Sequence, residues 1–371
     1  MTRRILFICP RFHSNQSDMV RKLVSEGHDV HYMVVHATKS EDHSLVAPQA
    51  LRPSLIGRCL NRFLNPTNQV RLRRKYLWPS IVDVYRHLFR IRPDVAVIRG
   101  TTSATVMFSM PFLLLSRCRI ILYTQGPKYR KISLRLRIFY FVAFRVLRIR
   151  WFTPVLYRGG TKHGETHADV TFIPFFKYPS PAAQHRSYQT SPLRILGVGK
   201  YEARKNLLLL IDAISRLADR HPLKFTWIGE KSEPHHHEYF EQAKNRVKQH
   251  NLQEMVDLGC NLTVEEVQQE YLDHDLFVIA SVRELASVAQ LEAMSFGLPV
   301  ICGGDNGTAH YVEDGHNGII VDADLDSVSA AMEVYLVEPE LVQLHGQRSL
   351  ARLTTEFDVE RSYQVFVSIM E

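Results

Sequence analysis

The sequence has few cysteines and no long apolar run, and each scarcity excludes a class of protein. Its five cysteines are scattered, without a CxxC pair, which argues against a disulfide framework or a structural zinc site and for a reducing compartment. The apolar run near the N-terminus is shorter than a signal peptide needs. The longest uncharged stretch, Gly100–Ser116, contains Pro111 and falls short of a spanning helix. We therefore expect that the chain does not cross a membrane.

Acidic residues are scarce in the first half of the chain. Residues 1–180 contain 30 Lys and Arg against 9 Asp and Glu, a balance of +21, whereas the remainder carries −13 within a total of +8. Such asymmetry indicates two domains, the first of which faces an anionic partner. A length of 371 residues with 45% hydrophobic and 23% charged residues also suits two globular domains.

A glycine-rich dinucleotide fingerprint is missing after the first predicted strand, residues 3–9, so we expect no dinucleotide site there. Strands and helices nevertheless alternate throughout, and the alternation restarts after a Pro-rich segment, which predicts parallel sheets. We predict an α/β fold with two doubly wound domains. The predicted divisions are an N-terminal domain over 1–176, a linker over 177–192, a C-terminal domain over 193–354, and a C-terminal helix over 355–371 that we expect to pack back on the N-terminal domain.

The segment Arg283–Gly307 is the most informative part of the chain. Glu284 and Glu292 are separated by seven residues, and between them Ser287 and Gln290 have the spacing of a capping box. The pattern predicts a buried strand, a loop that holds Glu284, and a short helix that carries Glu292. A helix N-terminus after a strand favours an anion, so we expect a phosphate group there.

The loop that opens the second domain contains Lys200 and Lys205. Cations in a glycine-containing turn before a helix would neutralise a diphosphate without a metal, although a solvated basic loop has the same composition. Ionised carboxylates accept hydrogen bonds from the adjacent hydroxyls of a sugar or a ribose. Glu284 and Glu292 could serve in that way, as a general acid–base pair, or as ordinary surface acids.

Together these segments resemble the retaining nucleotide-sugar glycosyltransferases of family 4, which adopt the GT-B fold of two Rossmann-like domains facing across a cleft. The resemblance rests on the Glu-x7-Glu motif from Glu284 to Glu292, on Glu-Ala-Met-x-x-Gly-x-Pro-Val over 292–300, and on the run 313–321. It covers most of residues 170–371. Over residues 1–169 it depends mainly on the order of strands and helices.

The resemblance implies a role for each candidate residue. Glu292 would hold the ribose of the nucleotide, Glu284 would contact the transferred sugar, and the two lysines would stabilise the leaving diphosphate as charge builds on it. No metal and no cofactor is implied, and the donor substrate would be a UDP- or GDP-sugar. The implied catalytic residues are Glu284, Lys200 and Lys205, the implied donor-binding residues add Glu292, Leu285, Ala286, Ser287 and Val288, and His13 and Gln125 are weak candidates on the acceptor side.

The implied function is transfer of the sugar to a hydroxyl of a cell-surface glycan acceptor, such as lipopolysaccharide, O-antigen, capsule or another lipid-linked saccharide. A nucleotide-sugar 2-epimerase on the same fold is the alternative, but it would not need a basic first domain. The high isoelectric point alone suggests a nucleic-acid binder, against which the acidic second half and the Glu-x7-Glu motif count. We therefore expect no nucleic acid among the partners.

The sequence also departs from the family pattern at four places. Leu285-Ala286-Ser287 stand where Gly-Phe-Gly or a similar triplet is usual, and Lys200 stands where Arg is usual. His310 replaces a common Glu, and Gln125 lies near the position of a first-domain His. We expect the choice of donor to depend on the triplet 285–287.

A helix is predicted over Leu134–Leu147, and its Arg137, Arg145 and Arg148 share one arc beside several aromatic residues. Such an arc suits an anionic membrane surface. Nucleic acid contact and a core helix with a solvated edge are the alternatives. Membrane docking would make the protein cytoplasmic and peripheral on the inner face of the cytoplasmic membrane.

Three consecutive histidines, His235–His237, suggest a metal site at first sight. Because they follow Pro234 in a polar segment, we predict an exposed loop without a metal instead.

Overall fold

The structure is a computed structural model, and it divides the chain into two compact units. Unit 1 comprises Met1–Pro154, Glu165–Phe176 and Val359–Glu371, and unit 2 comprises Val155–Gly164 and Lys177–Asp358. The structure describes residues 2–12, 14–35, 44–58, 78–100, 103–128, 138, 141–157, 170–188 and 191–371.

The described part of unit 1 forms a seven-stranded parallel sheet in the order β3-β2-β1-β4-β5-β6-β7. The strand order reverses between β1 and β4, where Ile5 pairs with Val95 and Ile8 pairs with Ile98. The strands are β1 (Arg4–Cys9), β2 (Asp29–Val34), β3 (Gln49–Ala50), β4 (Val95–Arg99), β5 (Arg119–Tyr123), β6 (Arg150–Thr153) and β7 (Val170–Phe172).

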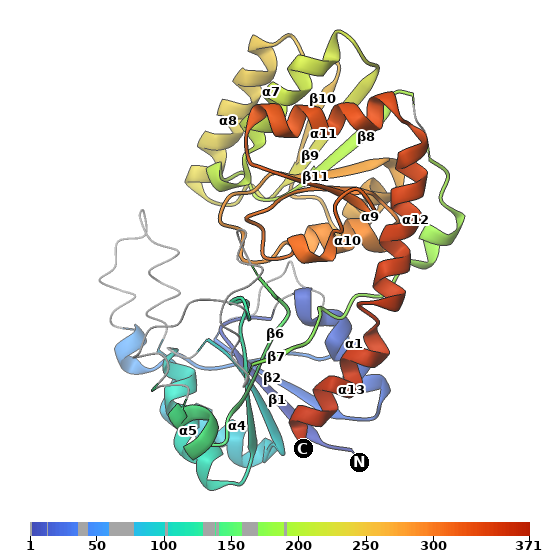
Figure 1. Ribbon diagram of the computed structural model, residues 1–371. Helices are drawn as coiled ribbons and strands as arrows, with labels where there is room; N and C mark the ends of the chain where they lie inside the picture. The colour runs from blue at the N-terminus through green and yellow to red at the C-terminus, as the bar shows by residue number, and fades with distance from the viewer. Residues whose placement is uncertain are drawn as a thin grey trace. The chain divides into compact units, whose positions relative to one another are not determined.

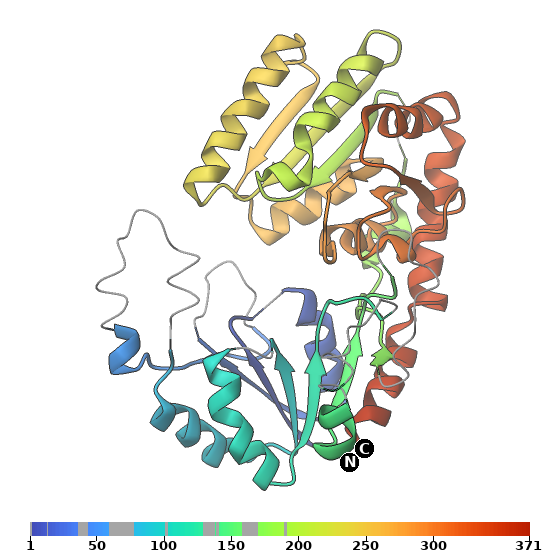
Figure 2. The ribbon, with the colours of Figure 1, turned by 60° about the vertical axis from the view of Figure 1, so that its left-hand side comes forward.

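Helices cover both faces of this sheet, as Figures 1 and 2 show. On one face α1 and α13 bury Val20 and Phe366 against the strands, and on the other α4 and α5 bury Leu88 and Leu113. The helices of unit 1 whose bounds lie within the described residues are η1 (Ser14–Gln16), α1 (Ser17–Ser25), α4 (Ile81–Ile91), α5 (Ala104–Leu115), the π-helix η3 (Val142–Val146) and α13 (Val359–Met370).

Unit 2 contains a six-stranded parallel sheet in the order β10-β9-β8-β11-β12-β13. The strand order reverses between β8 and β11, and such a switch point is where open α/β sheets bind ligands. The strands are β8 (Leu193–Val198), β9 (Leu223–Gly229), β10 (Val256–Cys260), β11 (Leu276–Ile279), β12 (Val300–Gly303) and β13 (Gly318–Val321).

The core of unit 2 lies between the sheet and the helices α7, α8 and α11, whose apolar faces bury Ile211, Tyr239 and Met332. The helix starts follow local rules: Asp324 accepts from the amide of Ser327 at 2.8 Å and so caps α11. The helices are η4 (Pro181–His185), η5 (Ala203–Lys205), α7 (Leu207–Ala218), α8 (Pro234–Gln249), α9 (Val264–Asp273), α10 (Val288–Ser295), η6 (Ala309–Tyr311), α11 (Leu325–Val337) and α12 (Glu340–Thr355).

The predicted fold class, two doubly wound α/β domains, is confirmed. The segment expected as a linker, 177–192, belongs to unit 2, where Arg186 donates to the carbonyl of Tyr271 at 2.7 Å and Tyr188 donates to that of Gly297 at 2.8 Å. Helix α13 belongs to unit 1. No helix among the described residues is long and apolar enough to cross a bilayer.

Two local predictions were wrong. His235–His237 lie in the first turn of α8 rather than in a loop, because Pro234 occupies a position where proline favours a helix start. Gln290 does not complete the predicted capping box, although Ser287 does cap α10. Of the helix predicted over 134–147, the described end is the π-helix η3, and Arg137 lies outside the described residues.

Candidate active site

The sequence-predicted donor residues lie on the loops that follow the two strands of the unit 2 switch point. Lys200 and Lys205 follow β8, and Glu284 follows β11. The loops are joined by backbone and side-chain bonds: the amide of Val282 donates to the carbonyl of Arg204 at 2.9 Å, and the Asn206 amide group donates to the carbonyl of Ala280, also at 2.9 Å. The topology therefore brings together residues that lie about eighty positions apart in the chain.

Lys205 and Glu284 form an ion pair, with exposed fractions of only 8% and 7%. Burial lowers the pKa of Lys205, and the Glu284 carboxylate offsets part of that effect. A cation held in so dry a position acts strongly on a charge that forms beside it. The structure thus brings together two of the three predicted catalytic residues.

Arg204 is a functional candidate that the sequence prediction did not single out. Its guanidinium donates to Glu284 at 2.7 Å and to Glu202 at 2.7 Å, so that Glu284 accepts from both Arg204 and Lys205. Glu202 in turn lies 3.4 Å from Nε2 of His236. Arg204 stands next to Lys205 in the sequence, and this adjacency was a signal for Arg204. The partner that the two residues share, Glu284, could not be identified from spacing.

Lys200 lies apart from this pair. Its ammonium contacts Glu230, at the end of β9, at 2.7 Å, and this contact lowers the pKa of Glu230 against the opposing effect of burial. Three carboxylates thus balance the charges of the three cations in this loop. The pairs are Lys200 with Glu230, Arg204 with Glu202, and Lys205 with Glu284. An incoming anion would meet cations already fixed in place, which is the condition for preorganised stabilisation.

The N-terminus of α10 offers backbone donors beside these cations. The amides of Leu285, Ala286 and Val288 donate to no acceptor within the described part of the chain, whereas the Ser287 amide donates to the Thr308 hydroxyl at 3.2 Å. Three open amides at a helix start form a site for phosphate oxygens. Leu285 itself is 53% exposed.

A buried polar network fixes this helix start. The Gln290 side chain donates to the carbonyl of Thr308 at 2.9 Å and accepts from Asn306 at 2.8 Å. The Gly307 backbone lies so close that a Cβ there would stand 1.9 Å from the carbonyl oxygen of Leu285. The predicted donor-binding loop is therefore held by residues 306–308, whose role the sequence did not reveal.

Glu292 lies on α10, half-buried, and accepts from the Tyr271 hydroxyl at 3.3 Å. Burial and the nearby carboxylate both raise the pKa of Tyr271. Among the described contacts none joins Glu292 to Lys200, Lys205 or Glu284. Its assignment to the ribose stays a prediction.

The acceptor-side candidates lie in unit 1. Gln125 follows β5, while His13 lies outside the described residues. At the neighbouring strand ends Arg99 donates to Asn15 at 3.3 Å. These groups lie at the carboxyl ends of parallel strands, where ligands of such sheets bind.

Glu202, His235 and His236 place possible metal-ligand atoms within 4.8 Å of one another. However, Nδ1 of His236 accepts from the amides of Ser232 and Glu233, both at 3.3 Å. That pattern assigns the ring hydrogen to Nε2, which then donates to Glu202 and offers no lone pair to a cation. His236 instead stabilises the start of α8 through its hydrogen bonds with Ser232, Glu233 and Glu202.

Known proteins have sequences similar to the part of the chain that contains this site. Residues 183–347 match the family model described as Glycosyl transferases group 1. The matched range contains the loops after β8 and β11 and all of α10. Most of unit 2 therefore resembles the domain that this family model describes.

Two curated relatives are similar to part of the chain. A mannosylfructose-phosphate synthase from Agrobacterium fabrum is 29% identical over 131 residues, which is 34% of this chain and 29% of that protein. The lipopolysaccharide core biosynthesis glycosyltransferase LpsE from Rhizobium meliloti is 23% identical over 183 residues, or 47% of this chain and 49% of that protein. The chain thus spans about half or less of the length of these relatives.

Solved structures extend the likeness of the fold to the whole chain. A glycosyltransferase from Rickettsia africae superposes with a TM-score of 0.72 at 13% identity, covering 100% of this chain and 98% of the other. Anabaena Alr3699/HepE, solved with UDP and glucose, gives 0.69 at 13% identity, with 99% and 98% covered. The two-domain fold expected from the sequence is therefore the fold of known glycosyltransferases.

Proposed function

We propose that the protein is a retaining glycosyltransferase of family 4 that moves a sugar from a nucleotide-diphosphate sugar to an acceptor hydroxyl. The observation that carries this proposal is the buried Lys205–Glu284 pair beside three open amides at the start of α10. The cations and amides suit a diphosphate, and the carboxylate suits a sugar hydroxyl. The complex of Alr3699/HepE with UDP and glucose supports a nucleotide sugar as donor.

In this reaction the bond between the anomeric carbon and the diphosphate oxygen breaks, and the acceptor oxygen forms the new bond on the same face. The proton of the acceptor hydroxyl passes to the leaving diphosphate. Negative charge grows on the leaving diphosphate. Lys205, Lys200 and the amides of Leu285, Ala286 and Val288 would stabilise that charge, while Glu284 would orient the sugar and Glu292 the ribose. Because the chain itself supplies several fixed positive groups there, we propose a reaction that needs no divalent metal and no cofactor.

A glycan or lipid-linked saccharide of the cell surface is the acceptor that we propose, supported by the resemblance of part of the chain to LpsE. The excess of cations in residues 1–180 supports docking of the protein on the anionic inner face of the cytoplasmic membrane. Flotation with anionic vesicles tests the docking. Binding at low salt that disappears at high salt is expected, and absence of binding at low salt would contradict it.

Product analysis tests the reaction. The protein is incubated with UDP- and GDP-sugars, with and without saccharide acceptors, in the presence of a chelator. We expect release of the nucleoside diphosphate only with an acceptor, and a product that keeps the donor's anomeric configuration. An epimerised donor without an acceptor would replace this proposal with the 2-epimerase, and a rate abolished by the chelator would overturn the metal-independent mechanism.

A further inference from the structure

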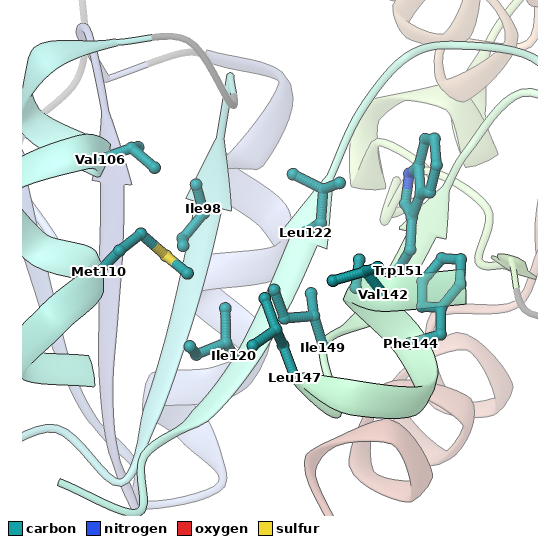
Figure 3. A pocket seen from close by; sticks show the side chains of 11 residues that line it. Ile98, Val106, Met110, Ile120, Leu122, Val142, Phe144, Leu147, Ile149 and Trp151 are labelled. Carbon is teal, nitrogen blue, oxygen red and sulfur yellow. The ribbon is translucent and has the colours of Figure 1, made fainter. Parts of the chain in front are cut away.

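Unit 1 contains an apolar cavity of about 170 Å³ over its sheet, away from the predicted transfer residues. Figure 3 shows Val106 and Met110 of α5 facing Val142 and Leu147 across the space above Ile120 of β5. All the side chains that line it are apolar except for the indole N–H of Trp151, which donates to the Thr124 hydroxyl at 2.9 Å. Dry apolar cavities of roughly 150 Å³ hold a six-carbon ring, so this one has room for the end of a hydrocarbon chain.

A second cavity, of about 590 Å³, lies next to the first. The two cavities share Ile120 and Leu147 in their linings, so they adjoin. The second cavity lies by the amino ends of β4 and β5 and is rich in cations. Its arginines are Arg3, Arg117, Arg119 and Arg148.

These arginines lack enough anions of their own. Arg117 and Arg148 form no ion pair with any residue that the structure describes, and the cavity's Asp94 is paired with Arg4 at 3.1 Å. Among the described residues Arg119 donates to a main-chain oxygen of Glu371, which also lines the cavity, so that four arginines face two acidic residues. Burial lowers the pKa of Arg119, and neighbouring arginines lower it further. A bound anion would relieve this repulsion.

Arg117 and Arg148 also share an unusual backbone conformation. Arg117 and Arg148 have φ angles of +55° and +52°, in the left-handed region that favours glycine or asparagine. At the corresponding turns from helix to strand elsewhere, the chain has Gly27, Asn251 and Gly297, and also Arg92 with a φ of +47°. Because glycine suits this conformation, the side chains of Arg117 and Arg148 can be removed without straining the backbone.

We propose that the two cavities form one binding site for an anionic membrane phospholipid, with the end of an acyl chain in the apolar cavity and the phosphate among the arginines. The arginine-lined cavity lies at the amino ends of the strands, whereas the acceptor-side candidates lie at their carboxyl ends. It therefore serves to hold the protein on lipid and not to present the sugar acceptor. It extends the proposed membrane docking but does not depend on the transfer reaction.

Monomeric dihexanoyl phosphatidylglycerol, carrying bromine at its chain ends, tests the site in the full-length protein. We expect saturable one-to-one binding that quenches tryptophan fluorescence, with most of the quenching lost in Trp151→Phe. The phosphatidylcholine with the same chains and glycerol phosphate without chains should each bind at least tenfold more weakly. Equal binding of either, or quenching that survives Trp151→Phe, would overturn the proposal, as would an absence of binding.

A matched pair of variants separates ligand binding from folding. Replacing both Arg117 and Arg148 by glycine should weaken lipid binding at least tenfold, while Tm stays unchanged or rises because glycine suits the left-handed backbone. Arg92→Gly is the control, since Arg92 has a φ of +47° but lines neither cavity. Unchanged affinity in the double variant, or an equal loss in the control, would refute the site. Because the lipid probe is monomeric, its binding is measured independently of vesicle docking and of sugar transfer. A failure of either of those proposals is therefore distinguishable from a failure of the lipid site.

Discussion

Lys205 and Glu284 form a buried ion pair that links the loops after β8 and β11, and Glu284 also accepts from Arg204 at 2.7 Å. The carboxylate therefore has two cationic partners, whereas Lys205 has this one carboxylate as its hydrogen-bond acceptor among the described contacts. The asymmetry has consequences for both stability and catalysis. Removing one member of a buried pair costs about 3–5 kcal/mol when the other is left unpaired.

Lys205→Ala should lower kcat by about 10²- to 10³-fold, the usual loss for one preorganised donor, with little loss of stability because Arg204 still pairs with Glu284. Glu284→Ala should destabilise the protein more, because it leaves Lys205 buried and unpaired. Steady-state kinetics and denaturant unfolding measure both effects, with Lys224→Ala, on the exposed side of β9, as control. Wild-type turnover in Lys205→Ala, or equal destabilisation by the two variants, would contradict the assignment.

Glu292→Ala should remove most turnover and raise KM for the donor, since we assign its carboxylate to the ribose. Glu292 also accepts a hydrogen bond from the Tyr271 hydroxyl. The experiment must therefore separate a structural role of this hydrogen bond from binding of the donor. Tyr271→Phe removes the hydroxyl, which also lies 3.2 Å from the carbonyl oxygen of Ala289, and should keep kcat and KM within a few-fold of wild type. If the two variants lose activity equally, Glu292 acts through Tyr271 and not through the donor.

The parallel sheets were predictable because each strand is a short buried run next to a helix with its own start and stop signals. Strand β13, for example, has the predicted bounds Gly318–Val321. One local rule gave a wrong result because a competing interaction was stronger. Gln290 has the spacing of a capping box, but its side chain bonds Thr308 and Asn306, which only the folded chain brings near.

The site was predictable where a residue's own chemistry fixes its role and not where a partner does. Lys205 and Glu284 stood out as a cation and a carboxylate beside helix starts. Their direct contact and the second contact from Arg204 depend on the pairing of β8 with β11. That pairing cannot be inferred from the spacing of residues along the chain. His236 was missed because a capping box normally uses Glu or Gln at that position, whereas here an imidazole accepts the hydrogen bonds.

Acid should destabilise the protein through His274, whose imidazole is buried and neutral. Its Nδ1 donates to the carbonyl of Glu270 at 2.7 Å and its Nε2 accepts from the Thr226 hydroxyl at 2.8 Å. Burial lowers the pKa of His274 below the 6.5 of a free imidazole. Between the lowered value and 6.5 the unfolded state binds more protons, so the free energy of unfolding falls as pH falls through that window.

Denaturant unfolding at pH 7.5 and 5.5 measures this slope. His28 and His345, whose pKa values burial also lowers, add to the wild-type slope, so His274→Gln should reduce the slope without abolishing it. His237→Gln, at an exposed position of α8, should leave it unchanged. A slope identical in wild type and His274→Gln would show that His274 does not bind protons differently in the two states.

The donor loop depends on the close approach of Gly307 to Leu285. Its amide donates to the Glu284 carbonyl at 3.0 Å, and a Cβ at this position would lie 1.9 Å from the carbonyl oxygen of Leu285. Gly307→Ala must therefore displace the loop that carries the open amides, at a cost of about 1–3 kcal/mol in stability. We expect KM for the donor to rise at least tenfold.

Gly304→Ala is the matched control, because a Cβ there meets nothing nearer than Ile320 at 3.5 Å, an ordinary van der Waals distance. It should keep KM and Tm close to those of the wild type. Initial rates over a range of donor concentrations, together with thermal melting, compare the two variants directly. If Gly307→Ala loses stability but keeps its KM, the segment Leu285–Ser287 does not bind the donor, and the open amides at the start of α10 are not its diphosphate site.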